Sequence, residues 1–297
     1  MASEPGLSKA RTGIAWLYIH GVENRDEAYF LTHAKAIHRE LIRKSNAYTF
    51  FGKPVACQFG YVYWGDLAGG VQGKIAEKNQ ISSRSIMASG LARTAKASPP
   101  GAFESRQLLH QFSHDAIWYL TNPAHQTAIN ARVVSVYERL NDLNGIEGTV
   151  LAGHSLGSVI ALKTITMAID QSAKTRDQLA GLVTYGSPVT TLLSAELEQK
   201  LAERKKHFSF FNKPDPTPKP WINVMYGADP VASGVYGGFS RFPEAFTFSI
   251  ADATMTVNAL GTVGGFFSGK ISPHAAYSNY PQAFVSSLKV GQKVMSK

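Results

Sequence analysis

The stretch TVLAGHSLGSVIAL, residues 149–162, is the part of the sequence from which we infer the fold of this chain. Its first half is apolar, as in a buried strand, and its second half continues with the apolar residues of a helix. Between the two halves, Gly153 and Gly157 flank Ser155. The sequence therefore predicts a tight strand-to-helix turn with Ser155 at its tip. The serine is either a nucleophile held up for attack or one of several small residues that pack a crossover.

The same alternation of strands and helices continues along the chain. Helical apolar spacing covers about 24–44, 103–120, 122–140 and 156–169. Buried strands are expected at 13–22, 54–66, 148–153, 179–188 and 221–232. Strands that alternate with helices predict an α/β fold with a mostly parallel sheet and helices on both faces. The segments 67–100 and 191–220 fit neither pattern, and we expect cap or lid insertions there.

Composition limits the class of protein. The chain has 297 residues, of which 44% are hydrophobic and 17% charged, so it can build a large core, and we expect a single domain over 1–297. Its single cysteine, Cys57, excludes an intramolecular disulfide. No signal peptide or spanning apolar run is visible, which predicts a cytoplasmic protein or one exported without a cleavable signal peptide. The sequence gives no indication of the oligomeric state.

The net charge of +9 favours an anionic partner, such as a phospholipid surface, or simply a basic, soluble exterior. No nucleic-acid-binding motif accompanies the charge, so we expect no nucleic acid partner. His110 and His114 share a helix face beside Asp115, but the motif lacks the glutamate and the third ligand of a zinc site. We therefore expect no metal and no cofactor.

Each small residue of the pattern G-x-S-x-G meets a steric or chemical requirement of a serine nucleophile. A serine nucleophile must stand on a sharp turn above the sheet edge, so its neighbours at 153 and 157 must be small. The helix begins directly after Ser155, and the N–H of Leu156 is a natural donor to a developing oxyanion. A second donor is expected after an earlier strand, where YIHGV ends. There Gly21 lets the chain turn after His20, and Val22 offers its N–H.

A serine nucleophile needs a base, and the base needs an orienting acid. Downstream of Ser155 the chain has only His207, within a basic run, and His274, in a loop near the C-terminus. We favour His274. For the acid, Asp229 follows a strong strand at a Gly–Pro turn. Asp215 lies in a proline-rich loop and Asp252 follows a weaker strand, FTFSI; both remain alternatives.

Substrate contacts are expected near the same turn. The candidates are His20, Gly21, His154, Phe266 and Phe267. His154 equally suits packing at the strand end, and Phe266 and Phe267 lie in a glycine-rich loop before His274. Tyr61, Tyr63 and Trp64 follow an apolar strand and are more typical of a core than of an acyl groove.

At this point the chain resembles the α/β-hydrolase superfamily, and within it the serine lipases and esterases. GHSLG at 153–157 is the lipase form of the nucleophile turn, and YIHGV is similar to the oxyanion strand of bacterial lipases. VTYGSPV, DPV at 229–231 and SPHAAY at 272–277 resemble fungal class-3 lipases. Two departures stand out: Ser158 replaces a usual glycine, and HGVENR brings polar residues to the oxyanion loop.

The resemblance implies a carboxylic ester hydrolase that acts on lipid or phospholipid esters through an acyl-enzyme. In that mechanism Ser155 attacks, His274 takes the proton, Asp229 orients the imidazole, and the amides of Leu156 and Val22 hold the oxyanion. The partners implied are a small-molecule ester or lipid and, at most, peripheral contact with an anionic membrane. An acyltransferase, thioesterase or amidase would use the same triad, and a non-catalytic binding module on this scaffold is a third reading.

Overall fold

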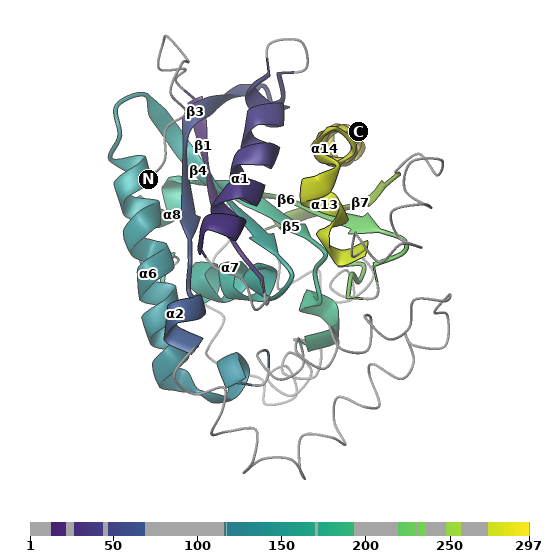
Figure 1. Cartoon of the computed structure of the whole chain (residues 1–297). Coiled ribbons are helices and arrows are strands. Elements are labelled where there is room, and N and C mark those ends of the chain that lie inside the picture. Colours follow the sequence, from purple (N-terminus) through teal and green to yellow (C-terminus); the bar gives the residue numbers. More distant parts are fainter. Residues whose placement is uncertain are drawn as a thin grey trace.

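The computed structural model describes residues 13–21, 27–43, 47–68, 116, 118–169, 172–192, 219–229, 231–235, 248–256 and 273–296. Its centre is a seven-stranded sheet with the order β2-β3-β1-β4-β5-β6-β7 (Figure 1). The strands are β1 Gly13–Ile19, β2 Thr49–Phe50, β3 Lys53–Val62, β4 Ile146–His154, β5 Leu179–Tyr185, β6 Lys219–Tyr226 and β7 Phe248–Met255. Every neighbouring pair is parallel except the short β2–β3 hairpin, which is antiparallel.

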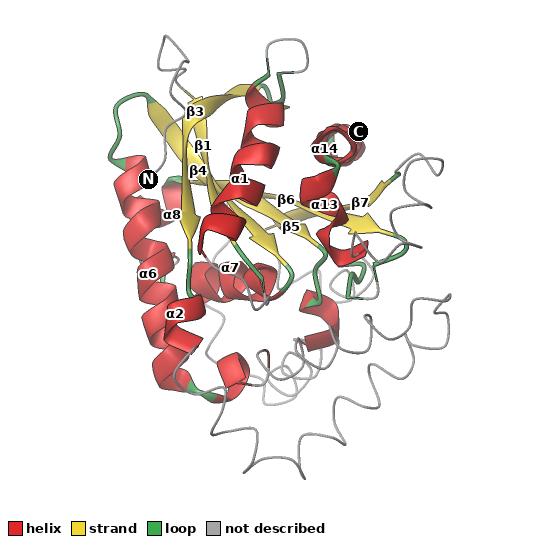
Figure 2. Ribbon diagram, viewed as in Figure 1, coloured by secondary structure: helices red, strands yellow, loops and turns green. Residues whose placement is uncertain are grey.

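Helices cover both faces of this sheet, as Figure 2 shows. The helices are α1 Glu27–Ile42, α2 Gly65–Ala68, α6 Pro123–Asn141, α7 Leu156–Met167, α8 Ala173–Asp177, α13 Ala276–Asn279 and α14 Pro281–Met295. A 3-10 turn, Pro273–Ala275, precedes α13. Because side chains alternate along a strand, each strand supplies both layers of the core.

Strand β1 shows how the two layers are built. Ala15, Leu17 and Ile19 belong to the core under α6 and α7. Ile14, Trp16 and Tyr18 belong to the core under α1 and α14. All six side chains are buried, which is why the sequence of this strand is continuously apolar instead of alternating.

The predicted α/β architecture, with a mostly parallel sheet and helices on both faces, is confirmed. The five strands predicted from the sequence all form, with ends that differ by a few residues. One expectation was wrong in detail: Asp252 does not follow the FTFSI strand but lies inside β7, which extends to Met255 because it pairs with β6 along its whole length.

The predicted cap or lid segments, 67–100 and 191–220, lie almost entirely outside the described residues, as does most of the predicted helix 103–120. These assignments, and the single-domain division, stay predictions. Among the helices that the structure describes, none is both long and apolar enough to cross a membrane.

Candidate active site

Ser155 lies between β4 and α7, at the tip of the predicted turn. Its backbone has φ 54° and ψ −129°, a conformation that side-chain-bearing residues rarely adopt and that costs about 1–3 kcal/mol. The amide of Ser155 donates to the carbonyl oxygen of Tyr185 at 3.0 Å, which ties the turn to the end of β5. The Ser155 hydroxyl is buried and makes no hydrogen bond within the described part of the chain. The strain is therefore held by the surrounding backbone.

Two glycines let the backbone pack closely around this turn. A Cβ at Gly157 would lie 2.2 Å from the carbonyl oxygen of Ile19, so α7 can begin directly against the end of β1 only if this residue has no side chain. A Cβ at Gly21 would lie 2.3 Å from the Cβ of Ser155. The predicted oxyanion strand therefore ends in contact with the serine.

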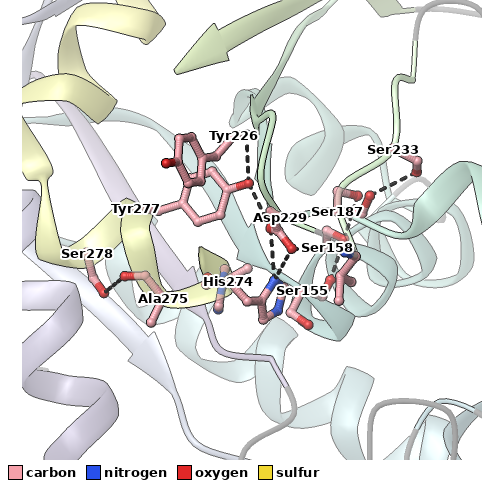
Figure 3. A network of polar contacts seen from close by, with 12 residues as sticks. Ser155, Ser158, Ser187, Tyr226, Asp229, Ser233, His274, Ala275, Tyr277 and Ser278 are labelled. Atoms are coloured by element: carbon pink, nitrogen blue, oxygen red, sulfur yellow. Dashed lines mark hydrogen bonds and ion pairs between the residues drawn. The ribbon is translucent and has the colours of Figure 1, made fainter. Parts of the chain in front are cut away.

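The side chains of His274 and Asp229 are buried beside the turn and lie within salt-bridge distance of each other. The Nδ1 of His274 lies 3.0 and 2.9 Å from the two carboxylate oxygens of Asp229. Asp229 follows β6, and His274 lies in the 3-10 turn before α13, so two segments far apart in sequence meet here. In Figure 3 the Ser155 side chain lies beside the imidazole, on the side away from Asp229. The order along this line is carboxylate, imidazole, hydroxyl.

Further donors hold the carboxylate of Asp229. The hydroxyl of Tyr277 donates to Oδ2 at 2.9 Å (Figure 3), and the amide of Val231 donates to Oδ1 at 2.9 Å. Burial by itself would raise the pKa of Asp229, but the charge of His274 and these hydrogen bonds lower it below its ordinary value. The carboxylate is therefore ionised, and it accepts the Nδ1–H of His274.

His154 supports the other face of the His274 imidazole. The two rings stack with their centroids 4.6 Å apart, and the Nε2–H of His154 donates to the carbonyl oxygen of His274 at 3.0 Å. Burial, and then the charge of His274, lower the pKa of His154 to about 3. His154 is thus a neutral ring at the end of β4, in agreement with the packing role weighed from the sequence.

His20 has both ring nitrogens hydrogen-bonded. Its Nε2 accepts from the amide of Trp64 at 3.1 Å, and its Nδ1 lies 2.5 Å from the carbonyl oxygen of Gly21. The ring is sandwiched between Phe30 and Trp64 at centroid distances of 3.9 and 4.9 Å. Burial lowers its pKa to about 3. This neutral ring fixes the end of β1 where the predicted oxyanion loop begins; its predicted contact with substrate stays a prediction.

The alternative acid Asp252 is held elsewhere. Its Oδ1 accepts from the Nδ2 of Asn223 at 2.8 Å and from the amide of Val235 at 3.0 Å. These bonds hold the loop after Asp229 against β7, while Asp229 has the contact with His274. Asp215 and His207, the remaining alternatives, lie outside the described residues.

Several other predicted residues also lie outside the described part of the chain: Val22, Phe266, Phe267, His110, His114 and Asp115. Leu156 is described, and it is the first residue of α7, with its backbone directly after Ser155. Trp64 is buried in the core, while Tyr61 and Tyr63 are half-buried. Within the described ranges, no group of three or more His, Cys, Asp or Glu side chains could hold a metal ion.

Two features of the site did not follow from the sequence. One is Tyr277, whose position three residues after His274 in SPHAAY was the available signal. The other is the role of Ser158, which stands where class-3 lipases usually have a glycine. Its hydroxyl donates to the carbonyl oxygen of Ser155 at 2.5 Å and lies 2.8 Å from the hydroxyl of Ser187. This pair links the start of α7 to the loop after β5.

The chain is similar to one protein family over part of its length and to several solved structures. The family described as lipase (class 3) matches residues 105–224, which include the Ser155 turn. No curated protein matches the sequence. Among solved structures, Est1E from Butyrivibrio proteoclasticus is similar at 11% identity over 89% of this chain and 88% of its own, with a TM-score of 0.41.

Two further solved structures are similar at the same level. A hormone-sensitive lipase from a metagenome library has 11% identity over 92% of this chain and 77% of its own, with a TM-score of 0.40. A proline iminopeptidase-related protein from Thermus thermophilus has 12% identity over 95% of this chain and 90% of its own, with a TM-score of 0.36. The segment that matches the class-3 lipase model contains β4, the strained serine turn and β5, so this part of the chain is similar to the lipases of that family.

Proposed function

We propose that this hydrolase cleaves carboxylic esters of lipids through an acyl-enzyme formed on Ser155. The observation that carries the proposal is the buried pair of Asp229 and His274 beside a serine on a strained turn. Because the Nδ1–H of His274 points to the carboxylate, its Nε2 carries the lone pair that a general base needs.

In the first step Ser155 attacks the ester carbonyl carbon. His274 takes the hydroxyl proton at Nε2, and a bond forms between the serine oxygen and the acyl carbon. The N–H of Leu156, at the start of α7, stabilises the oxyanion, and the N–H of Val22 is the proposed second donor; one such donor is worth about 3 kcal/mol. His274 then protonates the leaving alcohol as the ester C–O bond breaks.

In the second step water replaces the alcohol. His274 removes a proton from the water, the hydroxide attacks the acyl carbon, and the serine oxygen leaves with the proton that His274 returns. The products are the free acid and the original enzyme. Asp229 stays ionised throughout and stabilises the imidazolium cation of His274, which forms once in each of the two steps.

A lipid or phospholipid substrate is proposed on the class-3 lipase match and on the charge of +9 over the whole chain. A cationic surface is attracted to anionic bilayers, and each basic residue near such a surface contributes about 1 kcal/mol. The rate should therefore rise sharply on vesicles of anionic phospholipid compared with neutral vesicles, and the difference should shrink at high salt. Equal rates on short soluble esters and on both vesicles would remove the lipid part of the proposal.

The decisive test of the mechanism is covalent labelling. A fluorophosphonate probe should label the wild type at Ser155, and Ser155→Ala should lose both labelling and hydrolysis of a p-nitrophenyl ester. Ser287→Ala is the matched control, because Ser287 is also buried but lies on α14. Labelling that persists in Ser155→Ala would refute the assignment. Thioester, amide and alcohol-acceptor assays then separate the hydrolase from a thioesterase, amidase or acyltransferase.

A further inference from the structure

The peptide unit between Ser155 and Leu156 contains both a held carbonyl and a proposed catalytic donor. Its carbonyl oxygen belongs to Ser155, and its N–H belongs to Leu156, the amide proposed above to stabilise the oxyanion. A peptide unit is planar, so the contacts that hold the oxygen also set the direction of the N–H. Because Leu156 is the first residue of α7, its N–H has no carbonyl partner within the helix. The contacts of the Ser155 oxygen therefore affect the proposed oxyanion site.

Ser158 supplies two hydrogen-bond donors to this oxygen. Its backbone amide donates at 3.0 Å, and its hydroxyl donates to the same oxygen at 2.5 Å. The orientation of the peptide unit is set by the ψ angle of Ser155, −129°, in a backbone conformation that side-chain-bearing residues rarely adopt. The two bonds from Ser158 therefore hold this peptide unit in an orientation that the local preference of Ser155 does not favour.

A second buried hydroxyl fixes the direction of the first. The hydroxyl oxygens of Ser158 and Ser187 lie 2.8 Å apart, and both residues are fully buried. A carbonyl oxygen can only accept, so the Ser158 proton points to Ser155, and the Ser187 proton points to the Ser158 oxygen. The oxygen of Ser187 accepts from the amide of Val189 at 3.3 Å. Both hydroxyls therefore have one donor direction each.

This chain of hydrogen bonds continues to the loop of the candidate acid. The carbonyl oxygen of Ser187 accepts from the amide and the hydroxyl of Ser233, at 2.8 and 2.9 Å. Ser233 belongs to the segment that follows Asp229. Figure 3 shows the serines on one side of the pair formed by Asp229 and His274. The serine turn and the loop of the acid are thus joined by hydrogen bonds through Ser158 and Ser187.

A serine in a helix often bonds to a carbonyl one turn earlier without any further role. Thr166, near the other end of α7, is such a case, because its hydroxyl donates to the carbonyl oxygen of Lys163 at 3.1 Å. Ser158 differs in two ways. Its acceptor belongs to the strained residue of the turn, and a second buried hydroxyl donates to it, which strengthens the bond that it makes to Ser155.

We propose that Ser158 is a positioning residue for the oxyanion. Its hydroxyl holds the peptide unit of Ser155 and Leu156 so that the Leu156 N–H points to the oxyanion. Hydrogen bonds in such a chain polarise one another, by about 10–30% per bond, so the same contact makes this N–H a stronger donor. The inference rests on the proposed function, because the oxyanion forms only when Ser155 attacks an ester. Ser158 does not touch the substrate and acts through Leu156.

Ser158→Ala tests this role, because it removes the hydroxyl and keeps the backbone bond to Ser155. The kcat on a p-nitrophenyl ester should fall about three- to tenfold with KM little changed, since the oxyanion exists in the transition state and not in the bound substrate. Phenylboronic acid, which forms a tetrahedral anionic adduct with a serine hydroxyl, should bind more weakly by the same factor. The acidic limb of the pH profile of kcat/KM should not move, because Asp229 and His274 keep their contacts.

Thr166→Val is the matched control, because it removes the same kind of helix hydroxyl from the same helix. It should equal the wild type in kcat and in boronic acid binding. If Ser158→Ala does not fold, as judged by the circular dichroism melt, Ser187→Ala replaces it. That variant removes the donor to the Ser158 oxygen and should lower kcat and boronic acid affinity by a common factor of about two to five.

Three results would overturn the inference: a kcat equal to that of the control, a rise in KM alone, or a lower kcat with unchanged boronic acid binding. A shift of the acidic limb would equally overturn it, because the loss would then come from His274. A wild type that neither hydrolyses the ester nor reacts with the fluorophosphonate would instead refute the proposed function. A wild type that does both keeps the proposed function, whatever Ser158→Ala does.

Discussion

Two neighbouring aspartates, Asp229 after β6 and Asp252 inside β7, have nearly the same hydrogen-bonding pattern but different roles. Each accepts from a backbone amide of the loop that follows β6, Val231 for Asp229 and Val235 for Asp252. Asp229 also faces His274 and is 5% exposed, while Asp252 faces the amide of Asn223 and is half-buried. A carboxylate near the end of a strand is therefore a candidate catalytic acid only when it contacts a candidate base.

The largest difference between the two aspartates is expected in catalysis. Asp229→Asn should lower kcat on a p-nitrophenyl ester by about 10³- to 10⁴-fold, because the amide no longer stabilises the imidazolium and favours the wrong tautomer of His274. Asp252→Asn keeps an acceptor oxygen for Val235 and should stay within about tenfold of the wild type. A similar loss in both variants would mean that the line of Asp229, His274 and Ser155 is not the catalytic unit.

The second difference is expected in stability. Asp252→Ala removes the acceptor of the Val235 amide and one of the two acceptors of the Asn223 side-chain amide, which should lower the free energy of unfolding by about 2 kcal/mol. Urea unfolding followed by circular dichroism measures this, and Asp177→Ala on the exposed surface of α8 is the control. If Asp252→Ala is as stable as the control, the loop does not depend on its hydrogen bonds to β7.

The smallest effect is expected from the loss of one hydrogen bond to the Asp229 carboxylate. Tyr277→Phe removes one donor from its carboxylate, which should lower kcat about three- to tenfold with KM little changed. The acidic limb of the pH profile of kcat/KM should move to higher pH, because a carboxylate with one donor fewer holds the imidazolium more strongly. Tyr280→Phe, in the same segment, is the control. An unchanged pH profile would limit Tyr277 to packing.

Local patterns were predicted well because short-range sterics determine them. The strand, turn and helix around Ser155 follow from an apolar run interrupted by two glycines, and the structure has β4, the strained turn and α7 in those places. The end of β7 was predicted less well. The FTFSI segment is weak as an isolated strand, and its continuation to Met255 depends on pairing with β6, which the local sequence does not specify.

The histidines show the same limit. From the sequence His20 is a candidate for substrate contact, and His154 is a candidate either for substrate contact or for packing at the strand end. The identity of a histidine does not determine how deeply it is buried. In the structure both are neutral rings in aromatic stacks, one at the end of β1 and one against His274. Packing that lowers the pKa of an imidazole is a property of residues brought in from other segments, such as Trp64 and Phe30.

The α/β layering, the position of the serine turn and the short set of side chains from which a base and an acid could come follow from the amino-acid sequence. The contact of His274 with Asp229 instead of Asp252, and the hydrogen bond from Tyr277 to the same carboxylate, depend on the folded arrangement of distant segments. The difference arises from the separation along the chain over which each kind of interaction acts. Turn geometry and strand periodicity act over a few residues, whereas the contact between His274 and Asp229 joins positions 45 residues apart and exists only after the strands have taken their order in the sheet.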